Sequence, residues 1–139
     1  MTPDSPRRDA ARPFDTATDA KYVRLTTFRK DGTAVSSALW AADDAGKLVM
    51  FTPAESWKVK RLRRDRRVVV QECDRTGSEV SGEPVTGTAQ IVAGDTPEMD
   101  QIRQTLIKKY GIIGRLVVTG SVWRRGKSGT VGLVLTADA

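Results

Sequence analysis

The residues best suited to chemistry lie between Thr52 and Arg67. The ten residues KVKRLRRDRR, 58–67, contain seven basic side chains and one acidic side chain, while the whole chain of 139 residues has a net charge of +6. The rest of the protein is therefore close to neutral. A concentrated positive field of this kind favours an anionic partner: a phosphate ester, a polyanionic small molecule or nucleic acid. Lys58 and Arg61 are the cations nearest the start of this stretch.

A helix start precedes the basic residues. Thr52 is followed by Pro53 and, three positions after the threonine, by Glu55, which is the pattern of a capping box with proline at the first helical position. Ser56 is an alternative cap. Free backbone N–H groups at a helix start attract an anion, and the two hydroxyls add donors, so the stretch predicts a phosphate site. The alternative is that both hydroxyls only cap the helix and the cations form a solvated face.

The composition excludes several kinds of catalysis. The chain has no histidine, which excludes a Ser-His-Asp triad and histidine ligation of zinc or haem. One cysteine, Cys73, forms neither an intramolecular disulfide nor a thiolate metal cage. Its neighbours Glu72 and Asp74 raise the pKa of the thiol, so we expect it to be inert. We predict no metal ligand and no catalytic side chain, and any chemistry then comes from a bound cofactor or from carboxylates, lysines and hydroxyls.

Short β-rich segments separated by turns dominate the pattern. Asp31-Gly32 is a strong hairpin signal. Three helices are expected. The first covers residues 14–20, with Asp15 or Thr16 as its N-cap. The second begins after Thr52, and the third opens at 95–98 and ends at Gly111. Short strands at this spacing indicate an antiparallel barrel or sandwich. The seven predicted strands are 22–28, 34–41, 47–51, 67–72, 84–92, 114–123 and 129–136, with 74–83 a loop and RRGKSG, 124–129, a hairpin turn. The expected core-facing residues of the late helix are Met99, Ile102, Leu106, Ile107 and Tyr110.

Length and segment composition predict one domain, residues 14–139, after a disordered tail at 1–13. The first residues are polar and rich in proline and lack the apolar segment of a signal peptide. No hydrophobic run approaches the roughly 20 residues of a membrane span. We therefore expect a cytoplasmic protein with no membrane partner.

Four segments carry a family resemblance: LTTFRKDGTAVSSALW (25–40), LVMFT (48–52), SWKVKRLRRDRRV (56–68) and GTAQIV (87–92). The chain resembles the pyridoxamine 5′-phosphate oxidase-like proteins, in particular their actinobacterial deazaflavin-dependent branch. The resemblance implies a mainly β fold, an antiparallel split β-barrel of six or seven strands with short helices. It also implies a homodimer with two cofactor sites at the interface, each binding coenzyme F420 or, alternatively, FMN.

The same resemblance implies roles for individual positions. The strand that would line the ring system contributes Ser36, Ser37, Ala38, Leu39 and Trp40. The residues that would hold the phosphate are Phe51, Thr52, Ser56, Trp57, Lys58 and Arg61. Lys60, Arg63 and Arg64 are either contacts for the carboxylate tail of F420 or solvated. The implied reaction is hydride transfer between F420 and a small conjugated organic substrate, an oxidoreductase activity in which the cofactor supplies the reactive atom.

Three other functions remain open. An FMN-dependent oxidoreductase would use the same site, and a non-catalytic cofactor-binding protein would have the same pocket without turnover. A small barrel that binds single-stranded nucleic acid through residues 58–67 is a minor alternative. Such proteins interleave aromatic and basic residues, and only Trp57 lies near the basic stretch, which disfavours a nucleic-acid partner. Trp40, Trp57 and Trp123 either stack on a ring system or pack in the core or a dimer interface.

Overall fold

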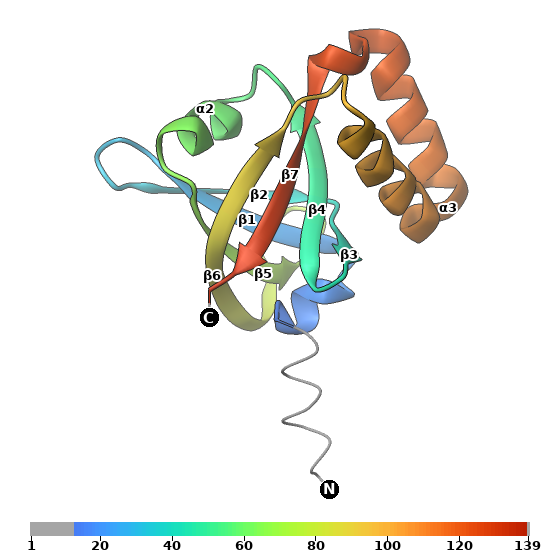
Figure 1. Ribbon diagram of the computed structural model, residues 1–139. Helices are drawn as coiled ribbons and strands as arrows, with labels where there is room; N and C mark the ends of the chain where they lie inside the picture. Colours follow the sequence, from blue (N-terminus) through green and yellow to red (C-terminus); the bar gives the residue numbers. More distant parts are fainter. Residues whose placement is uncertain (1–12, 139) are drawn as a thin grey trace, which may run out of the picture.

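The computed structural model describes residues 13–138, so most of the predicted tail lies outside the described residues. Seven strands form one antiparallel sheet in the order β2-β1-β5-β6-β7-β4-β3. The sheet curls around a central core, with α2 at one end and α3 along one side (Figure 1). The predicted antiparallel, mainly β barrel is confirmed. The strands are β1 (Tyr22–Phe28), β2 (Ala34–Leu39), β3 (Ala42–Asp44), β4 (Lys47–Pro53), β5 (Arg67–Cys73), β6 (Val80–Val92) and β7 (Thr130–Ala137).

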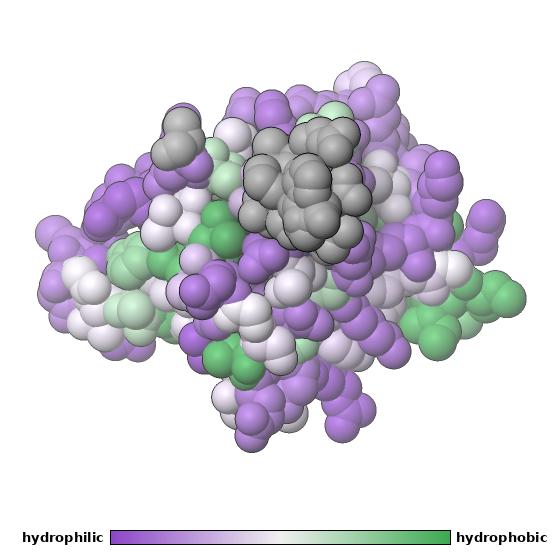
Figure 2. Space-filling view, turned by 90° about the horizontal axis from the view of Figure 1, so that it is seen from below, coloured by the Kyte–Doolittle hydropathy of each residue, from purple (hydrophilic) through white to green (hydrophobic). Residues whose placement is uncertain are grey.

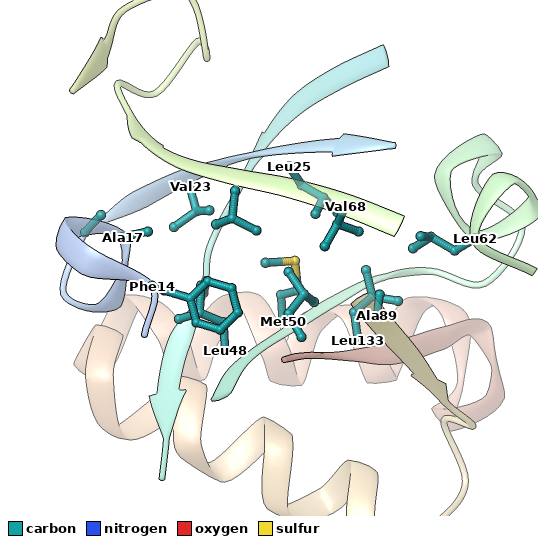
Figure 3. Close-up of a cluster of buried hydrophobic side chains, with 14 residues drawn as sticks. Phe14, Ala17, Val23, Leu25, Leu48, Met50, Leu62, Val68, Ala89 and Leu133 are labelled. Carbon is teal, nitrogen blue, oxygen red and sulfur yellow. The ribbon is translucent and has the colours of Figure 1, made fainter. Parts of the chain in front are cut away.

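Alternation along the strands builds the core, because successive side chains point to opposite faces of a sheet. Val23 and Leu25 of β1 are fully buried and meet residues from β4, β5 and β7. Figure 3 shows Leu48, Met50 and Leu133 in the same cluster. The helix α2 (Trp57–Arg64) closes this cluster at one end with Leu62, which is also fully buried. The hydrophobic core thereby fixes the position of the basic helix.

Several predicted boundaries among the strands were wrong. The strand expected over 34–41 ends before Trp40. The chain then forms the short strand β3, which was not predicted and which pairs with β4. The turn that follows is reduced to Ala45 and Gly46, both with positive φ. Part of the predicted loop 74–83 is sheet, because Ser81 and Val80 pair with the end of β5. Tertiary pairing extended strands that their own composition does not favour.

The predicted capping box at Thr52 was also wrong. β4 continues to Pro53, which pairs with Thr130 of β7, and the helix starts only at Trp57. Ser56, the alternative cap, occupies the N-cap position, but its side chain makes no capping hydrogen bond. Pairing with β7 therefore extends the strand past Thr52.

The helix expected near the start is a single 3₁₀ turn, η1 (Asp15–Thr18). Phe14, rather than Asp15 or Thr16, occupies its N-cap position, without a side-chain capping bond. The ring of Phe14 is buried in the core cluster, as Figure 3 shows. Burial of this ring, rather than a polar cap, holds the turn in place.

The helix α3 (Pro97–Arg125) differs most from the prediction. It begins as expected, with the Thr96 hydroxyl accepting a hydrogen bond of 3.2 Å from the Met99 N–H. Gly111, the predicted end, has φ 68 and ψ −140 and breaks the helix, but the chain then forms a second helical segment. The strand predicted over 114–123 and the hairpin turn at 124–129 were therefore wrong. We call residues 97–110 the first half of α3 and residues 112–125 the second half.

Contact between the two halves explains why the second half is helical. Gly114 lies against the first half so closely that an added Cβ would be 2.7 Å from the Cβ of Tyr110. Val118, one turn later, is buried as well. Residues 114–123 contain valines and threonine, which favour strands on their own, but the buried stripe has helical spacing. Among the helices described over residues 13–138, none is both long enough and apolar enough to cross a membrane.

Polar contacts fix the bend of α3 to the barrel. The ammonium of Lys109 donates hydrogen bonds to the carbonyls of Ala20 and Ala41. The hydroxyl of Tyr110 lies within hydrogen-bond distance of the carbonyls of Lys21 and Ala41 and of the Ala41 N–H. Burial raises the pKa of Tyr110 to about 12, so the hydroxyl stays protonated. The bend of α3 near Gly111 is therefore held against the segment before β1 and the segment after β2.

Arg103, a buried arginine, holds the other end of the second half. Its guanidinium donates to the Lys127 carbonyl at 3.1 Å and to the Thr130 hydroxyl at 3.2 Å, and it pairs with Asp100 at 3.2 Å. Residues 127–129 form the short helix η2 (Lys127–Gly129), which leads directly into β7. The Gly129 carbonyl in turn accepts a hydrogen bond from the N–H of Ala54, which follows β4.

Two glycines of the second half give a matched test of this packing. G114A places a methyl group against Tyr110 and is expected to lower the free energy of unfolding by about 1–3 kcal/mol. G120A adds a methyl group in open space and is expected to raise it by about 0.5–1 kcal/mol, through helix propensity. Urea unfolding of both variants measures the difference. Equal effects would contradict the packed helical hairpin.

Candidate cofactor site

Two apolar side chains set the orientation of α2. Val59 and Leu62 are fully buried, and α2 lies against β1 and β6. Five of the remaining six residues of this helix are Lys or Arg. Because the apolar stripe faces the core, Lys58 and Arg61, which border it, are brought over the ends of β1 and β4. The other three cations, Lys60, Arg63 and Arg64, are exposed.

The inner cations meet buried threonine hydroxyls. The Nε of Arg61 donates a hydrogen bond of 2.7 Å to the hydroxyl of Thr27, near the end of β1. The ammonium of Lys58 lies 3.4 Å from the hydroxyl of Thr52, near the end of β4. Both threonines are buried. The structure therefore brings together Thr52, Lys58 and Arg61 from the predicted phosphate residues and adds Thr27.

The electrostatics of these two cations are unfavourable without a ligand. Burial lowers the pKa of Lys58, and the neighbouring charge of Arg61 lowers it further. Burial, followed by the charge of Arg29, lowers the pKa of Arg61. Neither side chain has an ion-pair partner within residues 13–138. An anion bound between them would remove this penalty, because an opposite charge favours the protonated form.

Ser56 has an unused hydroxyl at the same helix start. Its Oγ is buried and has no hydrogen-bond partner among the described residues, although it occupies the N-cap position of α2. Buried hydroxyls in proteins are generally hydrogen-bonded, and one that is not invites a ligand. The free backbone N–H groups of the first helical turn lie next to it. The residues present therefore fit a phosphate group.

An outer pocket of about 650 Å³ adjoins these residues on the solvent side of α2. Arg61 contributes to both places, since it lines the pocket and also contacts Thr27. The indole of Trp57 is 71% exposed at the pocket, with the ammonium of Lys60 4.4 Å from its ring centroid. The lining has no carboxylate; it consists of Arg29, Lys30, Val35, Trp57, Lys60, Arg61 and Arg64.

The one acidic residue of the basic stretch is already engaged. Asp65 forms a bidentate pair with Arg67, at 2.9 and 3.2 Å. The hydrogen bonds from Arg67 hold the pKa of Asp65 below its usual value. Among the described residues, no carboxylate is ion-paired with the cations of the outer pocket. The charge of the pocket is thus left for a ligand.

The predicted ring-lining strand is split between two faces of the sheet. Ser36 and Thr26 are paired in the β1–β2 register, and their hydroxyls are 2.7 Å apart. Ser37 is paired with Leu25 on the opposite face, where Val35 reaches the outer pocket. By the same alternation Ala38 lies on the face of Ser36, and Leu39 packs against the core. A run of five consecutive residues therefore cannot line one surface of a single protomer.

Two other predicted residues lie away from the phosphate residues. Trp40, beyond the far end of β2, stacks on Tyr110 with ring centroids 4.2 Å apart and 7° between the planes. Phe51 points to the opposite face of β4 from Thr52 and packs against the cluster under α3. Within one protomer the structure therefore groups Thr52, Ser56, Trp57, Lys58 and Arg61, and leaves Trp40 and Phe51 in separate surroundings.

Three residues of the site were not predicted. Thr27 comes from β1, and Arg29 and Lys30 come from the β1–β2 turn. The sequence around these residues predicts a hairpin turn, but no local pattern indicates that this turn faces α2. Arg64 is bound there as well, through a 3.2 Å hydrogen bond to the Phe28 carbonyl.

The remaining chemical candidates give no second site. Cys73 is buried, and burial together with the charge of Asp74 raises the pKa of its thiol. This agrees with the predicted inert cysteine. Over residues 13–138, no cluster of His, Cys, Asp and Glu side chains is arranged to hold a metal ion.

Several solved structures have a fold similar to that of this chain. A conserved hypothetical protein of Mycobacterium tuberculosis aligns with a TM-score of 0.68 and 23% identity, over 100% of this chain and 82% of that one. An F420 reductase aligns with a TM-score of 0.60 and 18% identity, over 91% and 94%. HutZ, a haem storage protein of Vibrio cholerae, aligns with a TM-score of 0.66 and 11% identity, over 88% and 85%. At these identities the likeness shows the fold alone.

The sequence comparisons give the family. A search of curated proteins found no match. The sequence model of the family described as pyridoxamine 5′-phosphate oxidase matches residues 9–137, which is nearly the whole chain. The chain belongs to the pyridoxamine 5′-phosphate oxidase family and has its split-barrel fold.

Proposed function

We propose that this chain is an oxidoreductase that binds coenzyme F420 at α2 and exchanges a hydride between it and a small conjugated organic substrate. The single observation that carries the proposal is the pair of half-buried cations, Lys58 and Arg61, beside the unpartnered hydroxyl of Ser56. The family and an F420 reductase among the similar structures support the class of cofactor. When bound, such a cofactor supplies the reactive ring, and the protein supplies position and charge.

The two regions of the site suit a ligand with more than one anionic group. The inner residues Thr52, Ser56 and Lys58 would hold the phosphate, with Arg61 between the inner and outer regions. The outer pocket adds further cations without any carboxylate. F420 has a phosphodiester and a carboxylate tail, whereas FMN has one phosphate monoester. The outer cations therefore favour F420, and FMN is the alternative cofactor for the same inner residues.

A second copy of the chain is part of the proposal. The indole of Trp57 is mostly exposed at the rim of the outer pocket, where it has Lys60 over its ring. Large aromatic side chains are enriched at protein interfaces because they bury much apolar area. We propose that a second protomer covers this rim and closes the cofactor site, as in the homodimer that the resemblance implies.

The first experiment is titration of the purified protein with F420 and, separately, with FMN, followed by tryptophan quenching. K58Q/R61Q is expected to weaken F420 binding roughly 10- to 100-fold, because charge-assisted hydrogen bonds are lost. R66Q/R75Q removes the same charge from exposed positions outside the outer pocket and is expected to have little effect. Equal losses of affinity in the two variants would show that binding depends on net charge and not on this site. Tighter binding of FMN than of F420 would make FMN the cofactor of the site. If neither cofactor binds, the proposal is wrong.

Ser56 and Thr96 give a matched pair of N-cap variants. T96A removes a capping hydrogen bond and should lower the free energy of unfolding by about 1 kcal/mol. S56A removes a hydroxyl that has no partner, so its unfolding free energy should change by less than about 0.5 kcal/mol, while its affinity for F420 falls roughly fivefold. Urea unfolding and cofactor titration measure the two effects. If S56A destabilises like T96A, its hydroxyl is a structural cap.

The lowered pKa of Lys58 predicts a pH dependence. As pH rises, Lys58 loses its proton before an ordinary lysine with a pKa of 10.5 does, and its charge disappears from the site. F420 affinity of the wild-type chain should therefore fall in the alkaline range below that value. K58R keeps its charge there, because guanidinium groups stay protonated. Fluorescence titration over this pH range tests the difference; identical profiles would place Lys58 outside the binding site.

A further inference from the structure

The rim of the outer pocket combines an exposed aromatic side chain with an excess of positive charge. The indole of Trp57 is 71% exposed there. The cations that line the pocket are Arg29, Lys30, Lys60, Arg61 and Arg64. The carboxylates that neighbour them in sequence, Asp31, Glu55 and Asp65, do not line the pocket and are fewer than the cations. The apolar area at the rim is therefore surrounded by net positive charge.

The second half of α3 is another exposed apolar surface, and it is cationic as well. Its largest exposed apolar side chains are Ile112, Leu116 and Trp123. Figure 2 shows strongly hydrophobic side chains gathered at the edge of the molecule where α3 lies in Figure 1. Between Asp100 and Asp138 the sequence contains no acidic residue and seven Lys or Arg residues. A second copy that buried the Trp57 rim against the same rim, or against this helix, would bring cations together in either case.

Two opposing contributions act on such an interface. Burial of the indole favours association, because large aromatic side chains bury much apolar area. Like charges that symmetry brings together oppose it. A single phosphate at the inner residues leaves the outer cations without counter-charge, whereas a ligand with further anionic groups in the outer pocket would remove the repulsion. The number of anionic groups on the ligand therefore decides whether the rim of one copy accepts a second.

We propose that binding of F420 promotes association of two copies at the Trp57 rim, so that cofactor binding and dimer formation are linked equilibria. This inference rests on the proposed function, because it takes F420 as the ligand of the outer pocket. The carboxylate tail places negative charge between the cations of the two copies, and the indoles are then buried. The coupling is reciprocal: the factor by which F420 strengthens the dimer, per site, is the factor by which the dimer binds F420 more tightly than the monomer does.

Sedimentation velocity of the full chain, with and without saturating F420, measures this coupling. The dissociation constant of the wild-type dimer is expected to fall roughly 5- to 150-fold with F420, the usual range of coupling between sites. Saturating FMN, which has one phosphate, is expected to change it little. Without cofactor, raising KCl from about 0.05 to about 0.5 M is expected to strengthen the dimer, because salt screens repulsion between exposed charges. Cofactor fluorescence in the same samples records whether each cofactor is bound.

Three variants test whether the coupling arises at the rim. K30Q/K60Q removes two exposed cations of the outer pocket, so it should strengthen the cofactor-free dimer and reduce the effects of F420 and KCl. R66Q/R75Q removes the same charge from exposed positions outside this pocket and should behave like the wild type. W57S should weaken the F420-bound dimer roughly tenfold or more, because buried tryptophans contribute strongly to interfaces. All the altered side chains are exposed, and thermal melting checks that each variant folds.

The outcomes separate this inference from the proposed function. If F420 binds but the chain stays monomeric, or forms a dimer of unchanged dissociation constant, the inference is wrong and the proposed function stands. If F420 does not bind, both are wrong. Weakening of the cofactor-free dimer by KCl would also overturn the inference, because it would show that the rim meets an acidic surface of the second copy, such as Glu79 and Glu83. Dimerisation of W57S like the wild type, or equal behaviour of K30Q/K60Q and R66Q/R75Q, would place the interface elsewhere.

Discussion

Burial of Val59 and Leu62 against the barrel is the interaction on which the proposed cofactor site depends. These two side chains are the only apolar contribution that α2 makes to the core, and they hold a helix with five cations against β1 and β6. Burying each such side chain stabilises the fold by about 1.5–3 kcal/mol. That gain offsets the cost of keeping Lys58 and Arg61 partly out of water. Without the two apolar residues, mutual repulsion would move the cations into solvent, and no anion site would form.

The core therefore holds the proposed site in place, and a bound ligand would complete it. Two cations with lowered pKa values, a serine hydroxyl without a partner and an outer pocket without carboxylates are each unfavourable in the free protein. The same kind of molecule, one with a phosphate and further negative charges, would relieve all three. Agreement among independent features is a stronger argument for a ligand than any one of them.

The sequence predicted the parts whose local pattern and tertiary environment agree. The β-rich composition of 22–28 and the β-branched residues of 67–72 identified β1 and β5, and the helix-start pattern before the basic residues predicted α2, although it placed the first residue too early. The predictions that failed are those in which distant contacts decide. Pro53 belongs to a strand because it pairs with Thr130, and 114–123 is helical because Gly114 packs on Tyr110. Likewise Arg29 and Lys30 could not be assigned to the site, since only the barrel brings their turn to α2.

Thr52 and Phe51 are adjacent in β4 but serve different compartments, one at the anion site and the other under α3. A shift of one residue in the pairing of β4 with β7 would exchange the two side chains, because every strand residue would change faces. Six residue pairs, from Leu48 with Leu135 to Pro53 with Thr130, hold that register. In the course of evolution, insertions within β4 would therefore be selected against twice, once for the proposed ligand and once for the packing under α3.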